Sequence, residues 1–310
     1  MKSILITGGA GFIGQNLVKY FQSKYNIIII DNLSTKGTLK NFLFNRANVT
    51  FLKIDISNFS KIKESLKDIK IDYVIHAAAH FANENSIINP TKDLKTNILG
   101  TLNILEFSKQ KRIKKFLYLS SSCVYGESPL AKENLSLNPN ETPYAISKYS
   151  AELYVQFYKN FYKLNSTIIR VFNTYGPGEV NHKFRNVIPR FIDHALKNKV
   201  LSITGTGHET RDFTFVNDLV KIIAILIKSK NMPDLINSCT GNKTNIISLA
   251  EMIVKLTNSK SNINYSSIRK WDKVQNRLGS NIKIKKIFGI KKFTNLSSGL
   301  KETIKWYKNK

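Results

Sequence analysis

The sequence predicts an α/β fold, in which a doubly wound parallel sheet carries helices on both faces and a smaller mixed α/β lobe follows it. Three observations support this prediction. Short β-branched apolar segments alternate with helical patterns through the first half of the chain. The first segment, Ile4 to Ile6, runs directly into three closely spaced glycines and a helical pattern. Small and polar residues follow the ends of successive strands, which is where open α/β sheets bind ligands.

The composition is typical of a globular chain with one large domain or two unequal lobes. The chain has 310 residues, 42% of them hydrophobic, and no apolar run approaches the roughly 20 residues that span a bilayer. Cys123 and Cys239 are too few for a disulfide framework or a zinc site, so we expect no metal and a cytoplasmic location. The net charge of +27 comes from scattered residues, and only 8 of the 48 basic ones are arginine. We therefore expect no specific nucleic-acid binding and no membrane association.

Gly8, Gly11 and Gly14 indicate a dinucleotide site. They lie between the first strand and a helical pattern that continues through Phe21. Glycines let the backbone approach a pyrophosphate closely, and the free N–H groups and dipole of a helix N-terminus attract the anion. This stretch is therefore expected to hold the cofactor.

Acidic residues at the ends of the next two strands indicate which dinucleotide binds. A strand over 26–30 ends in Asp31 and Asn32. An acid there can hydrogen-bond ribose hydroxyls and would repel a 2′-phosphate, which favours NAD over NADP. Alternatively, Asp31 begins a turn. The third strand ends at Asp55 and Ile56, where an adenine amine could be recognised.

Two further strands end in small residues, beside which a flat ligand could lie. A strand over 72–79 ends in alanines, and one over 115–121 ends in serines. His76 is interpreted as packed beside its strand rather than catalytic. A long helix is expected between these strands, from Pro90 through Phe107.

The segment from Thr142 to Lys148 predicts a helix start that carries two reactive side chains. Thr142 is a good N-cap and Pro143 fits the first helical position, so Tyr144 and Lys148 lie four apart on one face. A tyrosine has a reference pKa near 10, but a neighbouring ammonium stabilises its phenolate and makes it a useful base. Lys148 supplies that charge, and Ser121 could hydrogen-bond the substrate oxygen. Such a set beside a nicotinamide is suited to alcohol oxidation.

The alternation of strand and helix breaks after residue 172. A sixth strand is expected over 166–171 and a short one over 201–204. The remaining chain is interpreted as helices with irregular links, over 187–197, 219–227, 249–256 and 300–306. We therefore predict a Rossmann-type NAD-binding domain over 1–172 and a substrate-binding lobe over 173–310, with parts around 206–228 packing back on the first domain.

Together these motifs resemble the nucleotide-sugar epimerase/dehydratase branch of the extended short-chain dehydrogenase/reductase superfamily. The resemblance covers nearly the whole chain, in segments 7–14 (TGGAGFIG), 76–79 (HAAA), 97–101 (NILGT), 120–126 (SSSCVYG), 144–148 (YAISK), 170–178 (RVFNTYGPG) and 210–213 (TRDF).

The resemblance implies a role for each matching residue. It implies a catalytic set of Ser121, Tyr144 and Lys148. It implies that NAD contacts Gly8, Gly11, Phe12, Ile13, Gly14, Asp31, Asn32, Asp55, Ile56, Ala77, Ala78, Asn97, Tyr144 and Lys148. It implies that the sugar nucleotide contacts Ser121, Ser122, Asn173, Asn186, Val187 and Arg211. It also implies a homodimer, in which the long helices around 97–107 and 144–161 form a four-helix bundle.

The residues after Ser121 indicate which reaction of the family this chain performs. The resemblance implies an Asp-Glu pair there in 4,6-dehydratases, and a glutamate at the second position in sugar-acid decarboxylases. This chain has Ser122 and Cys123, which supply neither carboxylate. The predicted function is therefore a nucleotide-sugar 4-epimerase of the UDP-glucose/UDP-galactose type, which oxidises C4 transiently with NAD and reduces it again from the other face.

Several alternatives stay open. Thr204 stands where the family often has an apolar residue near the nucleotide base. The substrate could accordingly be a UDP-uronate or a CDP- or GDP-deoxyhexose, and the reaction a different epimerisation or a reduction. A 4,6-dehydratase and a catalytically idle scaffold that binds NAD or RNA are less favoured. Arg211 could form a surface ion pair with an acid such as Asp212, and either Arg269 or Arg277 could be a second phosphate-binding arginine.

Overall fold

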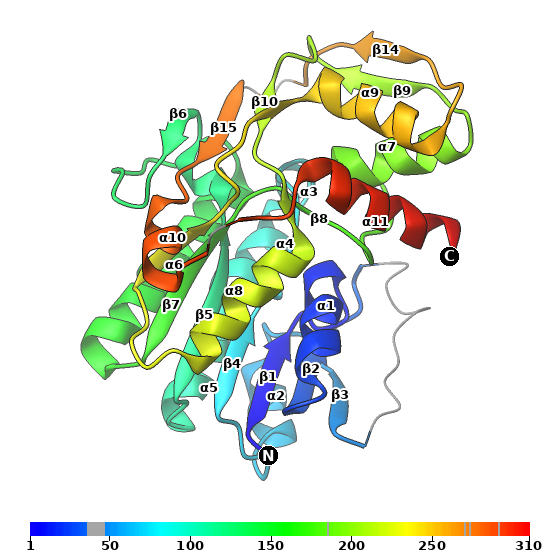
Figure 1. The fold of residues 1–310 in the computed structure, drawn as a ribbon. Coiled ribbons are helices and arrows are strands. Elements are labelled where there is room, and N and C mark those ends of the chain that lie inside the picture. Colours follow the sequence, from blue (N-terminus) through cyan, green and yellow to red (C-terminus); the bar gives the residue numbers. More distant parts are fainter. Residues whose placement is uncertain (36–46, 185, 270, 273, 291) are drawn as a thin grey trace. The chain divides into compact units, whose positions relative to one another are not determined.

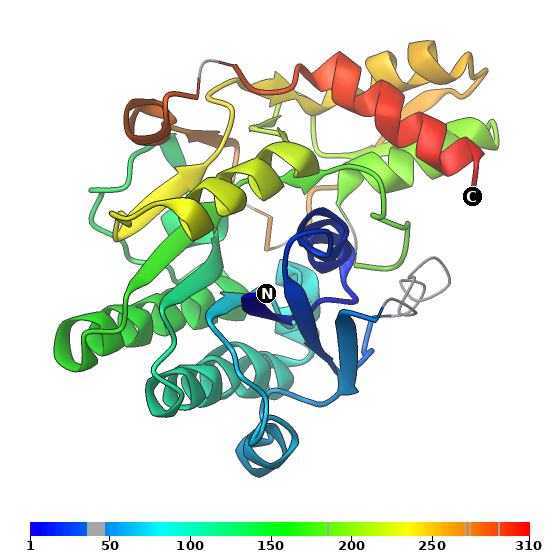
Figure 2. The same cartoon turned by 60° about the horizontal axis from the view of Figure 1, so that its bottom comes forward.

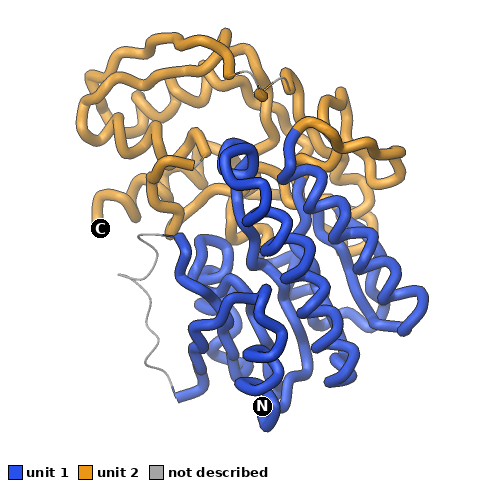
Figure 3. The backbone as a smooth tube through the Cα atoms, turned by 180° about the vertical axis from the view of Figure 1, so that it is seen from behind, with its two compact units in different colours: residues 1–121, 142–170, 220–236 blue, residues 122–141, 171–219, 237–310 orange. Residues whose placement is uncertain are grey.

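The computed structural model describes residues 1–35, 47–184, 186–269, 271–272, 274–290 and 292–310. The chain forms two compact units (Figure 3). Unit 1 comprises residues 1–121, 142–170 and 220–236, and unit 2 comprises residues 122–141, 171–219 and 237–310. The main boundary, after residue 170, lies close to the predicted boundary after residue 172. A single boundary does not divide the two units, because residues 122–141 belong to unit 2 and residues 220–236 belong to unit 1.

A seven-stranded sheet of order β12-β7-β5-β4-β1-β2-β3 organises unit 1 (Figure 1). Its strands are β1 Ser3–Thr7, β2 Asn26–Asp31, β3 Val49–Lys53, β4 Tyr73–His76, β5 Lys115–Ser121, β7 Ser166–Val171 and β12 Leu235–Ser238. Pairing is parallel from β3 through β2, β1 and β4 to β5. The strand order reverses between β1 and β4, which makes a switch point at the carboxyl ends of these strands.

Helices cover both faces of this sheet. In chain order they are α1 Phe12–Phe21, α2 Phe59–Ser65, α3 Asn83–Ile88, α4 Pro90–Leu94, the π-helical turn η2 Lys95–Leu99, α5 Gly100–Gln110 and α6 Pro143–Tyr162. Alternate strand residues such as Leu5, Val74 and Phe116 point to one face and form a core with α2, α5 and α6. Figure 2 shows α1 on the opposite face and α5 beside α6.

Helix α8 (Val216–Lys228) continues from unit 2 into unit 1. Its last turn is attached to the sheet by Lys115, whose Nζ donates to the carbonyls of Leu226, Ile227 and Ser229 at 3.0, 2.6 and 2.5 Å. A cation at a helix C-terminus binds the carbonyls that have no partner within the helix.

Unit 2 is built from short strands and amphipathic helices. Its sheets have the orders β13-β10-β15-β6, β11-β8 and β14-β9. The strands are β6 Ser128–Ala131, β8 Thr174–Tyr175, β9 Leu201–Thr204, β10 Thr210–Arg211, β11 Thr214–Phe215, β13 Thr244–Asn245, β14 Ile263–Ser266 and β15 Asn276–Gly279. The helical elements are the 3₁₀ turn η3 Ser122–Tyr125, α7 Val187–Leu196, α9 Ile246–Thr257, α10 Ile282–Phe288 and α11 Leu296–Lys308. A separate core around Phe191, Phe213 and Leu249 joins α7, α9 and α11.

The predicted α/β class is confirmed, with a parallel sheet and a second lobe of mixed structure. Two predicted elements differ in detail. The helix expected from Pro90 through Phe107 is α4, a π-helical turn and α5 in succession. Strand β4 ends at His76, three residues early, because the N–H of Ala78 donates to Thr7 Oγ1. Within the described ranges, no helix is both long and apolar enough to cross a membrane.

Candidate active site

The glycine stretch forms a tight cradle between β1 and α1. Gly8 has a φ of +69°, and a Cβ there would lie 2.7 Å from the backbone of Ala78. A Cβ on Gly14 would lie 2.1 Å from the carbonyl oxygen of Gly8. Gly11 is the N-cap of α1 and has no side chain to cap the helix, which leaves its first N–H groups for a ligand. Phe12 and Ile13 begin the helix. Only glycine allows this backbone packing.

Asp31, at the end of β2, binds this cradle. Its carboxylate accepts from the N–H of Ala10 at 3.0 Å and of Leu33 at 2.8 Å. Burial raises the pKa of Asp31, and these backbone hydrogen bonds oppose the rise. The turn that was the alternative interpretation of Asp31 is therefore present, and the same side chain also contacts the glycine stretch.

Asn32 and Asp55 lie together beyond β2 and β3. Asn32 Nδ2 donates to Asp55 Oδ2 at 2.8 Å, and Asp55 Oδ1 accepts from Ser57 N at 2.9 Å and from Ser57 Oγ at 2.7 Å. Burial opposes ionisation of Asp55, but these hydrogen bonds outweigh it and lower its pKa. The next residue, Ile56, is buried, and its carbonyl accepts from Asn103 Nδ2 at 2.9 Å.

Ala77 and Ala78 follow β4 beside the glycine cradle. Asn97 lies in the π-helical turn and connects this loop to α6. Its Oδ1 accepts from His80 N at 2.8 Å, and its Nδ2 lies 2.8 Å from Asp93 Oδ1 and 3.1 Å from Ser147 Oγ. The side chain of Asn97 therefore forms hydrogen bonds with protein groups that surround the predicted cofactor site.

The three predicted catalytic residues all belong to unit 1 and are all buried. Ser121 ends β5 and is 9% exposed, while Tyr144 and Lys148 on α6 are 6% and 2% exposed. Thr142 caps the helix as predicted, since its Oγ1 accepts from Ala145 N at 3.3 Å. The N–H of Tyr144 donates to Ser86 Oγ at 3.0 Å, which ties the start of α6 to α3.

Lys148 is bound to strand β5, inside the sheet. Its Nζ donates to the carbonyl of Leu119 at 2.6 Å and lies 4.3 Å from the centre of the Tyr118 ring. His76 is fully buried nearby, and burial together with the charge of Lys148 lowers its pKa to about 3. His76 is therefore neutral, and it packs beside the sheet as predicted.

Apart from Ser121, the predicted sugar-nucleotide residues lie in unit 2. Ser122 begins η3 and is buried, and Asn173 Nδ2 donates to the carbonyl of Asp212 at 3.3 Å. Asn186 is the N-cap of α7, and Val187 is the first residue of that helix. The N-terminus of α7, which no side chain caps, could bind an anion through its N–H groups.

Two arginines lie opposite each other in unit 2. Arg211 on β10 pairs in register with Arg277 on β15. Arg211 donates to the carbonyls of Thr210 and Val274 at 2.9 and 3.0 Å, and burial and then the neighbouring Arg277 charge lower its pKa. Arg277 is 7% exposed, and within the described residues its Nε has no hydrogen-bond partner. Two guanidinium groups in register, one half-buried and one buried, favour an anionic ligand.

The ion pair that was the alternative interpretation of Arg211 is present, but the acid is Asp272 and not the neighbouring Asp212. Arg211 lies 3.5 Å from Asp272, whereas Asp212 is fully buried and accepts from Thr240 and Gly241. Arg269 is the more exposed of the two late candidates, 4.9 Å from the Trp271 ring. The register of β10 and β15 therefore brings Arg277, and not Arg269, opposite Arg211.

Sequence reasoning missed several residues that hold the site. Thr7 and Thr101 bind the two ring nitrogens of His76, at 2.6 and 2.9 Å. A buried group of Ser120, Glu152 and Arg170 lies behind the predicted catalytic residues. The spacing of Glu152, four residues after Lys148, is a signal that could have revealed it.

These features fit NAD. A Cβ on Gly8 or Gly14 would fill the glycine cradle. No side chain caps the N-terminus of α1, which follows it, and Asp31 lies at the end of β2. The N–H groups of the cradle suit a pyrophosphate, and the carboxylate of Asp31 suits ribose hydroxyls. In the described part of the chain, no group of three or more His, Cys, Asp or Glu residues is arranged to hold a metal ion.

Comparison with known proteins agrees with this fit. The model of the "NAD dependent epimerase/dehydratase family" matches residues 4–238. An epimerase from Methanothermobacter thermautotrophicus is 35% identical, with a TM-score of 0.91 over 99% of this chain and 92% of that one. UDP-glucose 4-epimerase from Thermotoga maritima, solved with UDP-glucose, is 31% identical, with a TM-score of 0.92 over 99% of both chains.

Dehydratases match as well. Human dTDP-D-glucose 4,6-dehydratase is 32% identical over 319 residues, which cover 99% of this chain and 90% of that protein. Because the family model spans well over half of the sequence and these relatives align along nearly all of it, this chain belongs to the NAD-dependent epimerase/dehydratase family.

Proposed function

We propose that this protein is a nucleotide-sugar 4-epimerase acting on a UDP-hexose of the UDP-glucose/UDP-galactose type. One observation carries the proposal: Ser121, Tyr144 and Lys148 are all present and buried in unit 1, and the two residues after Ser121, Ser122 and Cys123, carry no carboxylate. The structure of the Thermotoga maritima relative with UDP-glucose supports the choice of substrate class.

The chain's own residues account for the proton transfers. The glycine cradle and Asp31 would hold NAD, which would supply the hydride acceptor and donor for C4 of the sugar. Tyr144, as phenolate, takes the proton of the C4 hydroxyl, and Lys148 stabilises the phenolate through its charge. The Ser121 hydroxyl hydrogen-bonds the oxygen as it becomes a carbonyl. Tyr144 returns the proton after the 4-keto sugar has turned its other face to the cofactor.

The two residues after Ser121 do not supply the acid and base that a dehydratase needs. Removal of water across C5 and C6 requires an acid and a base beside the sugar. Cys123, in η3, instead has its Sγ 3.5 Å from Nη1 of Arg277. A thiol and a serine hydroxyl at these two positions do not supply that pair, so the 4-keto sugar is reduced again rather than dehydrated.

Arg211 and Arg277 are proposed to bind the diphosphate of the substrate. Their opposite positions in adjacent strands and the unpartnered Nε of Arg277 within the described residues support this role. The fork of a guanidinium matches two phosphate oxygens. We therefore assign the second phosphate-binding role to Arg277 rather than Arg269.

Sugar interconversion tests the proposed function. The purified protein with NAD is incubated separately with UDP-glucose, UDP-galactose, their N-acetyl forms and their uronates, and the products are separated by chromatography. Approach to equilibrium from both members of one pair is expected. Failure to interconvert any of them while NAD is bound would contradict the proposal.

The matched control is Tyr144→Phe. Loss of the base is expected to lower kcat by about 10²–10⁴-fold while the fold is retained. Formation of a 4-keto-6-deoxy product would instead identify a dehydratase. Net consumption of NADH with a CDP- or GDP-sugar would identify a reductase, the alternative that Thr204 at the end of β9 favours.

A homodimer is also proposed, and an apolar face on unit 1 supports it. Helices α3, α4 and η2 pack beside α6. Their outward residues include large exposed side chains, namely Ile87, Ile88, Leu94, Leu99, Ile146, Leu153, Tyr154, Phe157 and Phe161. Apolar residues at helical spacing on an exposed face are typical of a helix–helix interface.

A further inference from the structure

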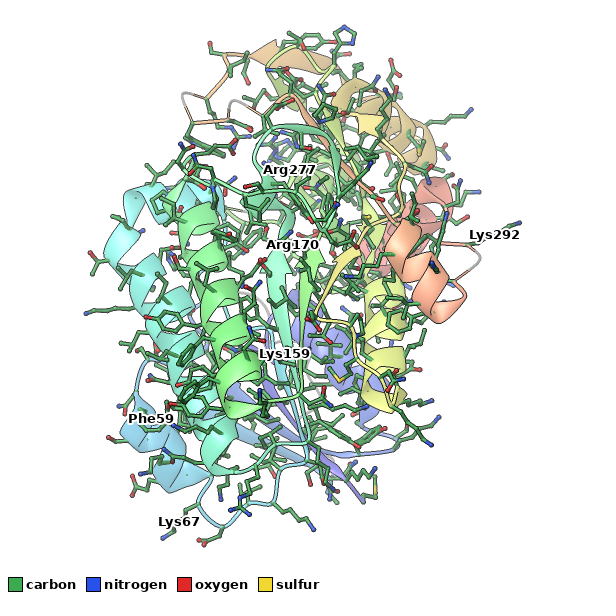
Figure 4. All side chains as sticks on the ribbon, turned by 90° about the vertical axis from the view of Figure 1, so that its left-hand side faces the viewer. Phe59, Lys67, Lys159, Arg170, Arg277 and Lys292 are labelled. Atoms are coloured by element: carbon green, nitrogen blue, oxygen red, sulfur yellow. The ribbon has the colours of Figure 1, made fainter. Side chains whose placement is uncertain are left out.

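A buried charged group lies directly behind the proposed catalytic residues. Glu152, on α6, is fully buried, and Arg170, on β7, is 3% exposed. Arg170 Nη2 donates to Glu152 Oε2 at 2.7 Å, and Arg170 Nε lies 3.0 and 3.2 Å from the two carboxylate oxygens. Ser120 Oγ, on β5, donates to Glu152 Oε1 at 2.5 Å. One carboxylate therefore joins a helix to two strands of unit 1 (Figure 4, where Arg170 is labelled).

Stability alone does not explain this arrangement. Removing two charges from water costs several kcal/mol per ion, and a buried ion pair often contributes no more than apolar residues of the same size. The surrounding core of α6, β5 and β7 is apolar and could hold such residues, since Val155, Phe116 and Ile168 belong to it. A specific geometric role is the better explanation.

The geometry identifies that role. On α6, Tyr144, Lys148 and Glu152 follow one another at intervals of four residues, so they share one face, about 6 Å apart along the axis. Lys148 Nζ binds the carbonyl of Leu119, and Glu152 binds the hydroxyl of Ser120. Two successive turns of the helix are thus attached to two successive residues of β5, and the next residue of that strand is Ser121.

Two attachment points restrict the position of α6 against β5 more than a single point would. A single hydrogen bond lets a helix rotate or slide against a strand, whereas two points one turn apart prevent both motions. Arg170 then holds the Glu152 carboxylate in one orientation, because a bidentate contact defines its plane.

We propose that Glu152 is a positioning residue, which acts through Ser120 and Arg170 to set Ser121 against Tyr144 and Lys148. This inference rests on the proposed function of those three residues. Displacement of a catalytic group by about 1 Å can lower a rate about 10²-fold, so removal of one attachment should affect turnover. Substrate and NAD affinity should change much less than turnover, because most of their predicted contacts are with residues other than these three.

Ser120→Ala tests the proposal with the smallest change. It removes one hydroxyl and leaves the Glu152–Arg170 pair intact. The expected result is a kcat lowered about tenfold, with KM and NAD affinity within about twofold of wild type. Ser108→Ala is the matched control, since Ser108 on α5 is also fully buried and donates to a carbonyl, that of Ile104 at 2.6 Å. Both variants should lose similar stability, and only Ser120→Ala should lose turnover.

A double variant, Glu152→Met with Arg170→Met, separates positioning from folding. Apolar residues can replace a buried ion pair without loss of stability. The double variant should therefore fold and still show the lowered kcat. Adding Ser120→Ala to it should cause no further loss, because the two changes act through one hydrogen bond. A wild-type kcat in folded Ser120→Ala, or fully additive effects, would overturn the proposal.

Hydrogen–deuterium exchange supplies a readout that needs no substrate. In Ser120→Ala, exchange should accelerate at residues 119–122 and 143–152, and in Ser108→Ala it should not. If wild type converts no sugar, the proposed function is wrong, and exchange alone then decides on the positioning role. Unchanged exchange in both segments would refute that role even in an active enzyme.

Discussion

His76 shows how a buried polar residue can be fully satisfied without taking part in chemistry. Thr101 Oγ1 donates to the carbonyl of Asn97 at 2.6 Å, so it can only accept from His76 Nε2. Thr7 Oγ1 consequently donates to Nδ1, at 2.6 Å. The imidazole is held as the neutral Nε2–H tautomer. Protonation would turn Nδ1 from an acceptor into a donor, so Thr7 Oγ1 could no longer donate to it.

This arrangement predicts a loss of stability in acid. The folded-state pKa of His76, about 3, lies below the unfolded value of 6.5, so the unfolded chain binds this proton first. The contribution is fully present above pH 6.5 and falls by about 1.4 kcal/mol per pH unit as the pH drops towards 3. Urea unfolding of wild type and His76→Gln between pH 7 and 5 measures it.

In His76→Gln, the free energy of unfolding should depend less steeply on pH than in wild type, because glutamine does not titrate. Exposed His208→Gln is the control for loss of a histidine outside this buried group. Identical slopes in wild type and His76→Gln would show that burial of His76 does not contribute to acid sensitivity.

Gly8 gives a residue-scale test of the cofactor cradle. Gly8 and Gly289 both have positive φ, +69° and +62°, so alanine is strained at each. A Cβ at Gly8 would meet the Ala78 backbone, whereas one at Gly289 meets nothing within 4 Å. Gly8→Ala should therefore weaken NAD binding at least about tenfold, a difference of about 1.4 kcal/mol.

Gly289→Ala should cost stability only, by about 1–2 kcal/mol. Calorimetric titration with NAD and thermal unfolding of both variants separate the two effects. Equal NAD affinity in Gly8→Ala and wild type would contradict the cradle.

At the scale of the element, the stability of the first turn of α6 depends on the predicted N-cap, Thr142. Thr142 accepts from Ala145 N and donates to Asn83 Oδ1 at 3.1 Å, so one hydroxyl caps the helix and links it to α3. Tyr144 is only two residues away. Fraying of this helix end would displace the proposed base directly.

Thr142→Ala should lower the free energy of unfolding by about 1 kcal/mol and should also lower kcat. Asn245→Ala removes an equivalent cap at α9, where Asn245 Oδ1 accepts from Ser248 N at 3.0 Å. It should cost similar stability in unit 2 and leave turnover unchanged. Equal loss of kcat in the two variants would indicate that general destabilisation, and not a local change at α6, lowers turnover.

At the scale of the whole molecule, exposed aromatic residues on α6 form part of an apolar surface. Phe157 is 49% exposed and Phe161 is 67% exposed, and their rings stack at 5.4 Å. Leaving them in water is unfavourable by about 25 cal/mol for each Å² of apolar surface, so a partner that covers them is favoured.

Phe157→Asp should convert the proposed dimer to a monomer, because burying a carboxylate in an apolar interface is costly. Light scattering coupled to gel filtration measures the mass. Ile282→Asp on α10, which is 68% exposed outside this face, should leave the mass unchanged. A wild-type mass of 35.3 kDa would show that no dimer forms.

Local sequence was enough to predict the parallel sheet, the glycine cradle, the capped start of α6 and the burial of His76. Each depends on neighbours within a few residues: glycine φ preference, N-cap chemistry and runs of β-branched residues. The two-residue strands β8, β10, β11 and β13 could not be predicted, since so short a segment has no periodicity and forms only where a partner strand lies beside it.

Only the tertiary structure decided which distant residues meet. It placed Arg277 rather than Arg269 opposite Arg211, because strand register is set by pairing across about 65 residues of chain. It joined Glu152 to Ser120 and Arg170, and it assigned 122–141 to unit 2 and 220–236 to unit 1. The sequence by itself determined the glycine turn before α1 and the capped helix start that carries Tyr144 and Lys148, because these follow from local backbone preference. Their supporting contacts depend on packing between elements, which no local pattern encodes.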